Sequence, residues 1–163
     1  KYAEGEFDQV DRVLYDLKNN PYSRRIMTNI YTYEDLHEMN LYPCAYSMTF
    51  NVTGNKLNGI LNQRSQDILV ANNWNVVQYA VLLHMFAQVS NLEVGELVHV
   101  IADAHIYDRH VSLVEELIQR EQFEAPKFVM NKEIKNFYDF TVDDFKLIDY
   151  KKNAQIKNIP VAI

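Results

Sequence analysis

The chain contains a single thiol, Cys44, and residue types that bind anions and hydrogen-bonding groups follow it along the sequence. The pair Arg64-Ser65 offers a guanidinium and a hydroxyl, and Asn75 offers an amide. Further along, His105 and Tyr107 offer an imidazole and a phenol. A thiolate is a nucleophile, and guanidinium groups both favour the thiolate and bind phosphate. This ordered set predicts an active site for an anionic, hydrogen-bonding substrate.

Taken one at a time, these residues have ordinary structural explanations. A free cysteine such as Cys44 is often an inert residue of the core, and a histidine such as His105 at a strand edge is usually structural. No histidine has a recognisable metal-ligand spacing to another histidine, a cysteine or an aspartate, so the sequence predicts no metal site. The remaining histidines are interpreted as structural only; they are His37, His84, His99 and His110.

The composition is that of one globular domain over 1–163. Of the 163 residues 48% are hydrophobic, and there are only four glycines and four prolines, so the chain can build a sizeable core. One cysteine excludes an internal disulfide and fits a reducing, cytoplasmic compartment. We expect no membrane partner, because no apolar stretch is long enough to span a bilayer and no secretion leader opens the chain.

The net charge of −6 argues against a DNA-binding role, because polyanion binding needs a broad cationic face. A local arginine cluster can still hold a small phosphate. The candidates are Arg24, Arg25 and Arg64, and the adjacent pair Arg24-Arg25 is the least ordinary of them. A small anionic ligand is therefore compatible with an acidic chain.

Apolar spacing predicts two amphipathic helices, at 8–19 and 109–121, and a short helix or turn at 34–39. Residues 76–90 are apolar almost all round, which is typical of a buried central helix. Strands are expected at 25–32, 44–53, 57–66, 96–102, 127–130 and 143–150. Helices and strands alternate without regular repetition, so the predicted class is α+β, with a mixed β-sheet packed on helices.

Thr53-Gly54-Asn55-Lys56 is typical of a hairpin turn between two of these strands. Gly59 inside the second strand indicates a bulge or a close backbone approach, and Gly95 indicates a break. If the hairpin pairs directly, Cys44 and the segment Gln63-Arg64-Ser65 lie together at its open end. The thiol and the guanidinium would then face one place.

Seven segments, taken together and in their order along the chain, resemble thymidylate synthase, and they extend over nearly its whole length. The segments that carry the resemblance are Ser23-Arg24-Arg25-Ile26, Pro43-Cys44, Gln63-Arg64-Ser65-Gln66-Asp67, Asn75, Gln78-Tyr79-Ala80, Asp103-Ala104-His105-Ile106-Tyr107 and Pro160-Val161-Ala162-Ile163. The resemblance implies a sheet-on-sheet homodimer that methylates deoxyuridylate (dUMP) to thymidylate (dTMP). It also implies 5,10-methylenetetrahydrofolate as co-substrate, and no metal.

The resemblance also implies a role for each matching residue. Cys44 is the expected nucleophile toward uracil C6, and Asn75 the amide that reads O4 and N3 of the base. The expected phosphate ligands are Arg64 and Ser65 from one subunit and Arg24 and Arg25 from the other, with Gln63 supporting the network. His105 and Tyr107 are the expected ribose ligands, and Asp67, Ala162 and Ile163 the expected folate contacts.

The chain departs from the family pattern at a few positions, namely Ala45, Thr49, Ala71-Asn72-Asn73-Trp74 and Ala102. The family's N-terminal portion has no counterpart before Lys1, so we expect the sequence to be part of a longer enzyme. Two alternatives stay open. One is a pyrimidine nucleotide hydroxymethylase, for which Asn75 favours uracil over cytosine, and the other is a truncated, non-catalytic nucleotide- or RNA-binding module.

Overall fold

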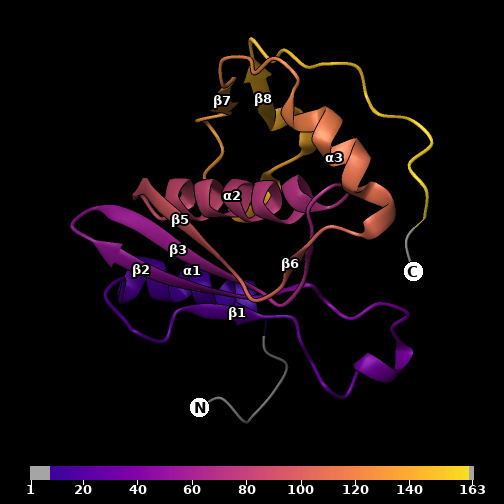
Figure 1. Ribbon diagram of the computed structural model, residues 1–163. Helices are drawn as coiled ribbons and strands as arrows, with labels where there is room; N and C mark the ends of the chain where they lie inside the picture. The colour runs from indigo at the N-terminus through magenta and orange to yellow at the C-terminus, as the bar shows by residue number, and fades with distance from the viewer. Residues whose placement is uncertain (1–7, 162–163) are drawn as a thin grey trace.

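The computed structural model describes residues 8–161, and its largest element is a four-stranded sheet (Figure 1). The strands are β1 (Met27–Asn29), β2 (Ala45–Thr53), β3 (Lys56–Gln63) and β5 (Glu93–Ile101). They lie in the order β1-β2-β3-β5, with β3 and β5 parallel and the other neighbours antiparallel. A mixed sheet packed on helices confirms the predicted α+β class.

Two helices, α1 (Gln9–Asn19) and α2 (Asn72–Val89), bury their apolar side chains in one core with β2 and β3. α1 begins at Asp8, whose carboxylate accepts hydrogen bonds from the backbone N–H groups of Val10 and Asp11. Removing these side chains from water drives the packing of the two helices on the sheet. The main members of the core are Val13, Leu17, Met48, Phe50, Leu57, Leu61, Leu83 and Phe86.

The second half of the described chain covers the other side of α2 (Figure 1). Here lie the helix α3 (Val111–Ile118) and the antiparallel pair β7 (Lys127–Met130) and β8 (Phe145–Ile148). The ring of His84 on α2 meets Phe128 of β7 edge-on at 4.9 Å. Gln88 on α2 donates to the backbone carbonyls of Asn131 and Ile134. α2 is thus contacted from both sides, which explains why its sequence is apolar almost all round.

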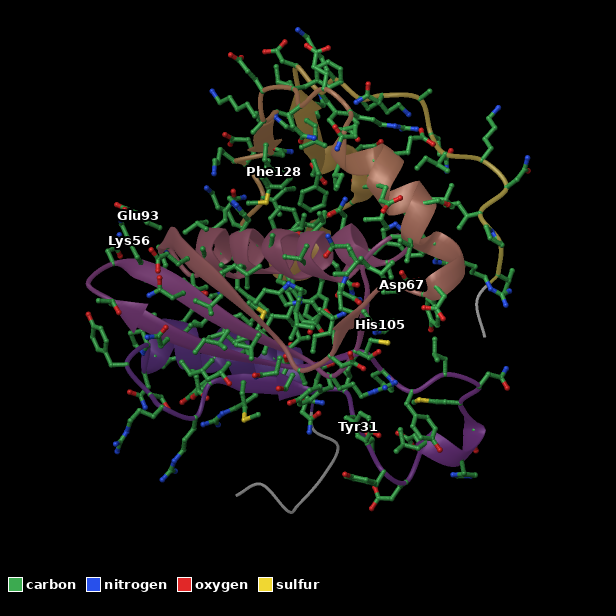
Figure 2. All side chains as sticks on the ribbon, in the orientation of Figure 1. Tyr31, Lys56, Asp67, Glu93, His105 and Phe128 are labelled. Carbon is green, nitrogen blue, oxygen red and sulfur yellow. The ribbon has the colours of Figure 1, made fainter. Side chains whose placement is uncertain are left out.

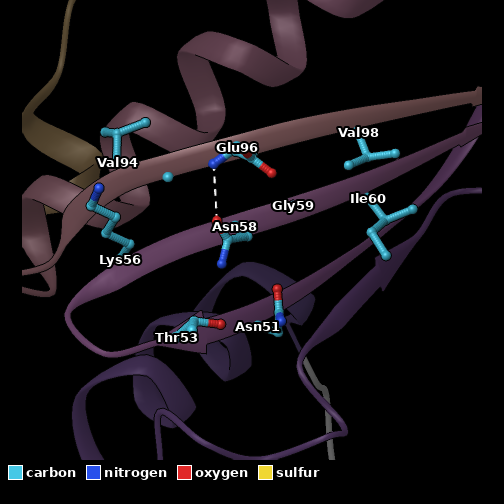
Figure 3. A pocket seen from close by; sticks show the side chains of 10 residues that line it. Asn51, Thr53, Lys56, Asn58, Gly59, Ile60, Val94, Glu96 and Val98 are labelled. Carbon is cyan, nitrogen blue, oxygen red and sulfur yellow. Dashed lines mark hydrogen bonds between the residues drawn. The ribbon is translucent and has the colours of Figure 1, made fainter.

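A bulge interrupts the pairing of β3 with β5. Leu57 lies opposite Val94, but Gly59 lies opposite Leu97, so β5 has one extra residue. The Asn58 side chain fills the gap, and its Oδ1 accepts a hydrogen bond of 2.9 Å from the backbone N–H of Glu96 (Figure 3). A Cβ on Gly95 would lie 2.1 Å from that same oxygen. Gly95 is therefore part of the strand, and the break predicted there is wrong.

The face of the sheet opposite the helices has no covering element among residues 8–161. Ile60, Val98 and Val100 point outward from β3 and β5 and are 41–48% exposed. A shallow depression of about 580 Å³ lies over the bulge on this face (Figure 3). An antiparallel or mixed sheet normally buries one face and solvates the other with polar side chains. Branched apolar residues on the outer face are therefore typical of a surface that another protein layer covers.

The predicted hairpin is confirmed, but the strand before it and the second strand of the hairpin are shorter than expected. The strand predicted at 25–32 is only β1, because the Asn29 side chain accepts from the Tyr31 N–H and turns the chain. The strand predicted at 57–66 ends at Gln63. Gln66–Asp67 form a separate short strand, β4, which pairs in parallel with β6 (Ala104–His105).

Two predicted helices also have different bounds. The helix expected at 76–90 begins at Asn72, because the turn after Asp67 runs directly into it: Asp67 Oδ1 accepts from the Leu69 and Val70 N–H groups. The helix expected at 109–121 is α3 alone, preceded by a 3₁₀ turn at Asp108–His110. A similar turn, Leu36–Glu38, stands where a short helix or turn was expected.

The remaining differences are at strand ends. β5 begins at Glu93, earlier than the expected 96–102, and ends at Ile101. The strand expected at 143–150 is β8 alone, with 3₁₀ turns at Phe137–Asp139 and Val142–Asp144 before it. Asp144 caps the second turn by accepting from the Thr141 N–H and hydroxyl. The strand predicted at 127–130 is confirmed as β7.

Candidate active site

The open end of the β2–β3 hairpin brings Cys44 and Arg64 together, as the sequence predicts. Ala45 pairs with Gln63 at the last rung of the ladder, and the Arg64 N–H donates to the Cys44 carbonyl at 2.9 Å. The Cys44 side chain is half-buried, with its Sγ 4.0 Å from the Tyr42 carbonyl oxygen. The thiol is thus held at the rim of the sheet.

The Arg64 side chain turns back along the segment that precedes Cys44. Its Nε donates to the Pro43 carbonyl at 3.0 Å and one Nη to the Tyr42 carbonyl at 2.8 Å. A guanidinium has five N–H donors, so these two bonds anchor the group and leave other donors for an anion. The charge of Arg64 thus lies beside the segment that carries the thiol.

A set of buried amides lies next to this pair. Gln63 and Gln66 are 2% and 1% exposed. Gln63 Nε2 donates to the Ser65 carbonyl at 2.8 Å, to Gln66 Oε1, and more weakly to Asn75 Oδ1 at 3.4 Å. Gln63 Oε1 lies 2.9 Å from Nε2 of His99 on β5. Burying a polar group costs free energy of folding unless the group is hydrogen-bonded, and the polar side chains of this cluster are bonded chiefly to one another.

Asn75 enters this cluster from the first turn of α2. Its Oδ1 faces Gln63, and no other hydrogen bond to its side chain occurs among residues 8–161. The amide NH₂ is therefore free to donate to a ligand. An amide in that position can recognise a carbonyl oxygen on a planar ring.

The short parallel pair of β4 and β6 places two more predicted residues side by side. Asp67 pairs with His105, and both lie at the same end of the sheet in Figure 2. His105 Nδ1 is buried without a hydrogen bond, 3.7 Å from an Asp103 carboxylate oxygen. Tyr107 packs edge-on against the His105 ring at 5.1 Å. The imidazole and the phenol thus form one unit near the amide cluster.

Arg24 and Arg25 are not part of this constellation in a single chain. They precede β1, next to Ile26, whose carbonyl accepts from the Phe50 N–H at 2.9 Å. Phe50 is six residues beyond Cys44 along β2, and a strand rises about 3.3 Å per residue. The two arginines therefore lie about 20 Å from Cys44. The predicted folate contacts Ala162 and Ile163 lie outside the described residues.

The sequence interpretation missed several residues at the site. His99 and Gln66 belong to the amide cluster. His110 is 1% exposed and its Nε2 lies 2.7 Å from the Pro160 carbonyl, while Arg109 donates to the Val161 carbonyl at 2.6 Å. One signal was available for His99: it alternates with Leu97 and Ile101 on the inward face of β5, where a polar residue needs a partner.

The described residues also bear on cofactors. Among residues 8–161 no group of three or more potential metal ligands occurs. No helix in the same range is long and apolar enough to cross a membrane. Asp67 uses Oδ1 to bond Leu69 and Val70, and its other carboxylate oxygen makes no bond in this part of the chain. That oxygen is available to an N–H donor of a ligand.

Comparison with known proteins gives a consistent result. The thymidylate synthase family profile matches residues 1–163. Thymidylate synthases from Bacillus licheniformis and Bacillus mojavensis are 50% and 49% identical to the chain over 149 residues, which is 91% of this chain and 53% of each relative. The solved structure of thermostable thymidylate synthase A from Bacillus subtilis has a TM-score of 0.91 at 43% identity, covering 98% of this chain and 58% of that one. The chain thus spans little more than half the length of these relatives.

Proposed function

The chain belongs to the thymidylate synthase family, and we propose that it supplies the nucleophile and the nucleotide-binding groups of an enzyme that methylates dUMP to dTMP. The observation that carries the proposal is the open end of the hairpin. There the chain's one thiol, Cys44, lies beside the anchored guanidinium of Arg64. The free NH₂ of Asn75 lies across the same cluster.

In this proposal Cys44 Sγ adds to C6 of the uracil, and the electron pair of the C5–C6 double bond moves toward O4. C5 then becomes nucleophilic enough to bond to a one-carbon unit. Asn75 would donate to O4 and so stabilise the negative charge that develops there. After C5 loses its proton, the bond from the one-carbon unit to the folate nitrogen would break and leave a methylene group on C5. Hydride transfer to that methylene would then accompany departure of Sγ, which restores the C5–C6 double bond and leaves dihydrofolate.

The nucleotide's phosphate and sugar would be held by separate groups. Arg64 has N–H donors to spare and Ser65 adds a hydroxyl, which suits a phosphate dianion. His105 and Tyr107 project from β6 and the segment after it, and would bind the ribose hydroxyl. Binding by fixed groups holds C6 close to Sγ, which lowers the entropic part of the barrier.

The co-substrate would be 5,10-methylenetetrahydrofolate, which supplies both the one-carbon unit and the hydride. The free carboxylate oxygen of Asp67 suits an N–H of its pterin ring. Ala162 and Ile163 are proposed contacts of the same ligand on the basis of the family resemblance. The proposed steps need no metal.

We also propose that the enzyme is a homodimer in the cytoplasm, where Cys44 would stay a free thiol. A two-fold partner seated on the outer face of the sheet would cover Ile60, Val98 and Val100. It would also bring its own Arg24 and Arg25 to the phosphate, which explains two exposed arginines about 20 Å from Cys44 in the same chain.

The test is a product analysis on the full-length protein, including any residues that its gene encodes beyond the printed sequence. We expect dUMP and 5,10-methylenetetrahydrofolate to give dTMP and dihydrofolate in equal amounts. Formation of 5-hydroxymethyl-dUMP without dihydrofolate would instead identify a hydroxymethylase. Binding of dUMP or RNA with no product of either kind would identify a non-catalytic module.

A further inference from the structure

We propose that His99 is a positioning residue that orients the Gln63 amide and, through it, the Asn75 amide, and so sets the preference for uracil over cytosine. The inference rests on the proposed function, since it concerns how that site reads a base. It assigns a role to a histidine that touches neither the thiol nor the expected position of the nucleotide.

The geometry at His99 is that of a specific contact. His99 lies on the inward face of β5, and its Nε2 is 2.9 Å from Gln63 Oε1. Gln63 is 2% exposed, so water does not compete for its amide. Burial lowers the pKa of His99, which keeps the imidazole neutral, with one N–H and one lone pair.

The direction of each hydrogen bond follows from a backbone group that cannot reverse. The Ser65 carbonyl can only accept, and Gln63 approaches it at 2.8 Å, so the Gln63 NH₂ must face Ser65. Gln63 Oε1 must then face His99. Because that oxygen can only accept, His99 must carry its proton on Nε2. The imidazole and the carbonyl thus hold the two ends of one amide.

The orientation passes from Gln63 to Asn75. The two N–H hydrogens of Gln63 serve the Ser65 carbonyl and Gln66 Oε1, and Asn75 Oδ1 shares one of them at 3.4 Å. With Oδ1 turned toward Gln63, Asn75 presents its NH₂ to the ligand. Uracil has the acceptor O4 at the matching position, whereas cytosine has an amino donor there. Two donors facing each other in a desolvated site are unfavourable, so this arrangement selects uracil.

Without the His99 donor, Gln63 Oε1 would be buried with no partner. The Ser65 carbonyl alone would then hold the amide, so the Gln63 NH₂ would be fixed less firmly against Asn75. Asn75 would rotate more readily and present Oδ1 to the base, which suits the cytosine amino group. A histidine that only fills space would affect folding stability but would leave the choice of base unchanged.

The experiment measures the dissociation constants of dUMP and dCMP, and kcat/KM for dUMP, in full-length variants of matched stability. His99→Leu removes the donor, and His99→Gln keeps an N–H at nearly the position of Nε2. We expect His99→Leu to lower the dUMP:dCMP affinity ratio about tenfold or more, because a buried acceptor loses its partner. His99→Gln should keep the ratio within about threefold of wild type.

The matched control is His84→Leu. His84 is also half-buried with a pKa lowered by burial, but it packs on Phe128 on the far side of α2. It should lower the melting temperature and leave the affinity ratio unchanged. If His99→Leu does not fold, His99→Phe and Gln63→Glu replace it. The first removes the donor within a ring of similar shape, and the second removes the NH₂ that faces Ser65.

The outcomes separate the two proposals. A wild-type protein that binds neither nucleotide would overturn the proposed function and this inference with it. A wild-type protein that prefers dUMP, together with donor-free variants that keep the same ratio, would overturn the role of His99 alone. A ratio that falls equally in His99→Gln and His99→Leu would also overturn it.

Discussion

The two ends of the β2–β3 hairpin differ in the burial of their polar side chains. At the open end, polar side chains such as Gln63 and Gln66 are buried and bond chiefly to one another. At the turn end, which Lys56 and Glu93 mark in Figure 2, charged groups are exposed, and Arg24 and Arg25 nearby have no side-chain partner among residues 8–161. We therefore propose that the open end reads a base within one chain, whereas the arginines near the turn would bind a ligand only beside a second chain.

The largest expected effect is at the open end. Cys44→Ala should lower the turnover of dUMP by several orders of magnitude, roughly 10⁴-fold or more, because the proposed nucleophile is removed. Nucleotide affinity should change little, since in the proposed site other groups hold the phosphate and sugar. Steady-state rates and equilibrium binding of dUMP check both parts, and near-normal turnover of Cys44→Ala would exclude Cys44 as the nucleophile.

The next effect tests whether the arginines near the turn act across a dimer. Arg25→Ala should weaken dUMP binding about ten- to a hundredfold, because a charge-assisted bond to phosphate is lost. Mixing Arg25→Ala chains with Cys44→Ala chains should then restore activity, since each mixed dimer holds one site with both groups intact. Activity assays after subunit exchange, verified by native mass spectrometry, provide the measurement. No recovery in verified mixed dimers would place Arg25 outside the partner's site.

A smaller effect is expected for the base-reading amide. Asn75→Asp should lower kcat/KM for dUMP about tenfold or more relative to dCMP, because a carboxylate cannot donate to O4. The ratio of the two kcat/KM values is the readout, with Asn73→Asp as a control of equal charge in the same helical turn. An unchanged ratio would mean that another group reads the base.

The smallest effect is purely structural and belongs to the turn end. Gly95→Ala should lower the free energy of unfolding by about 1–3 kcal/mol, because the new methyl group must displace Asn58 or the Leu57 carbonyl. Denaturant unfolding followed by circular dichroism measures it. Gly54→Ala is an informative comparison, since Gly54 has a φ of 63° but open space around it, so only backbone strain contributes there. A Gly95→Ala protein as stable as wild type would show that the bulge adapts freely.

The sequence predicted the contact of Cys44 with Arg64 because the turn at Gly54 sets the register of two long strands. It did not predict the start of α2, since Asn72 and Asn73 are weak helix formers and the turn that leads into the helix depends on the Asp67 side chain. It also missed His99, because one inward polar residue in an apolar strand gains meaning only when its partner Gln63 is known. Local sequence patterns thus predict how neighbouring strands pair, whereas hydrogen bonds between side chains on different strands can be identified only from the three-dimensional structure.

The hydrogen bonds from Arg109 and His110 to the C-terminal segment at Pro160 and Val161 have a consequence for which sequence changes this segment tolerates. Both side chains bind main-chain carbonyls, at Pro160 and Val161, and a carbonyl is the same whatever residue carries it. The two hydrogen bonds therefore do not depend on which residues occupy the tail, but they do depend on how many residues the tail has. Substitutions at Pro160 or Val161 should therefore keep both hydrogen bonds, whereas inserting or deleting one residue before Pro160 should move the two carbonyls away from Arg109 and His110.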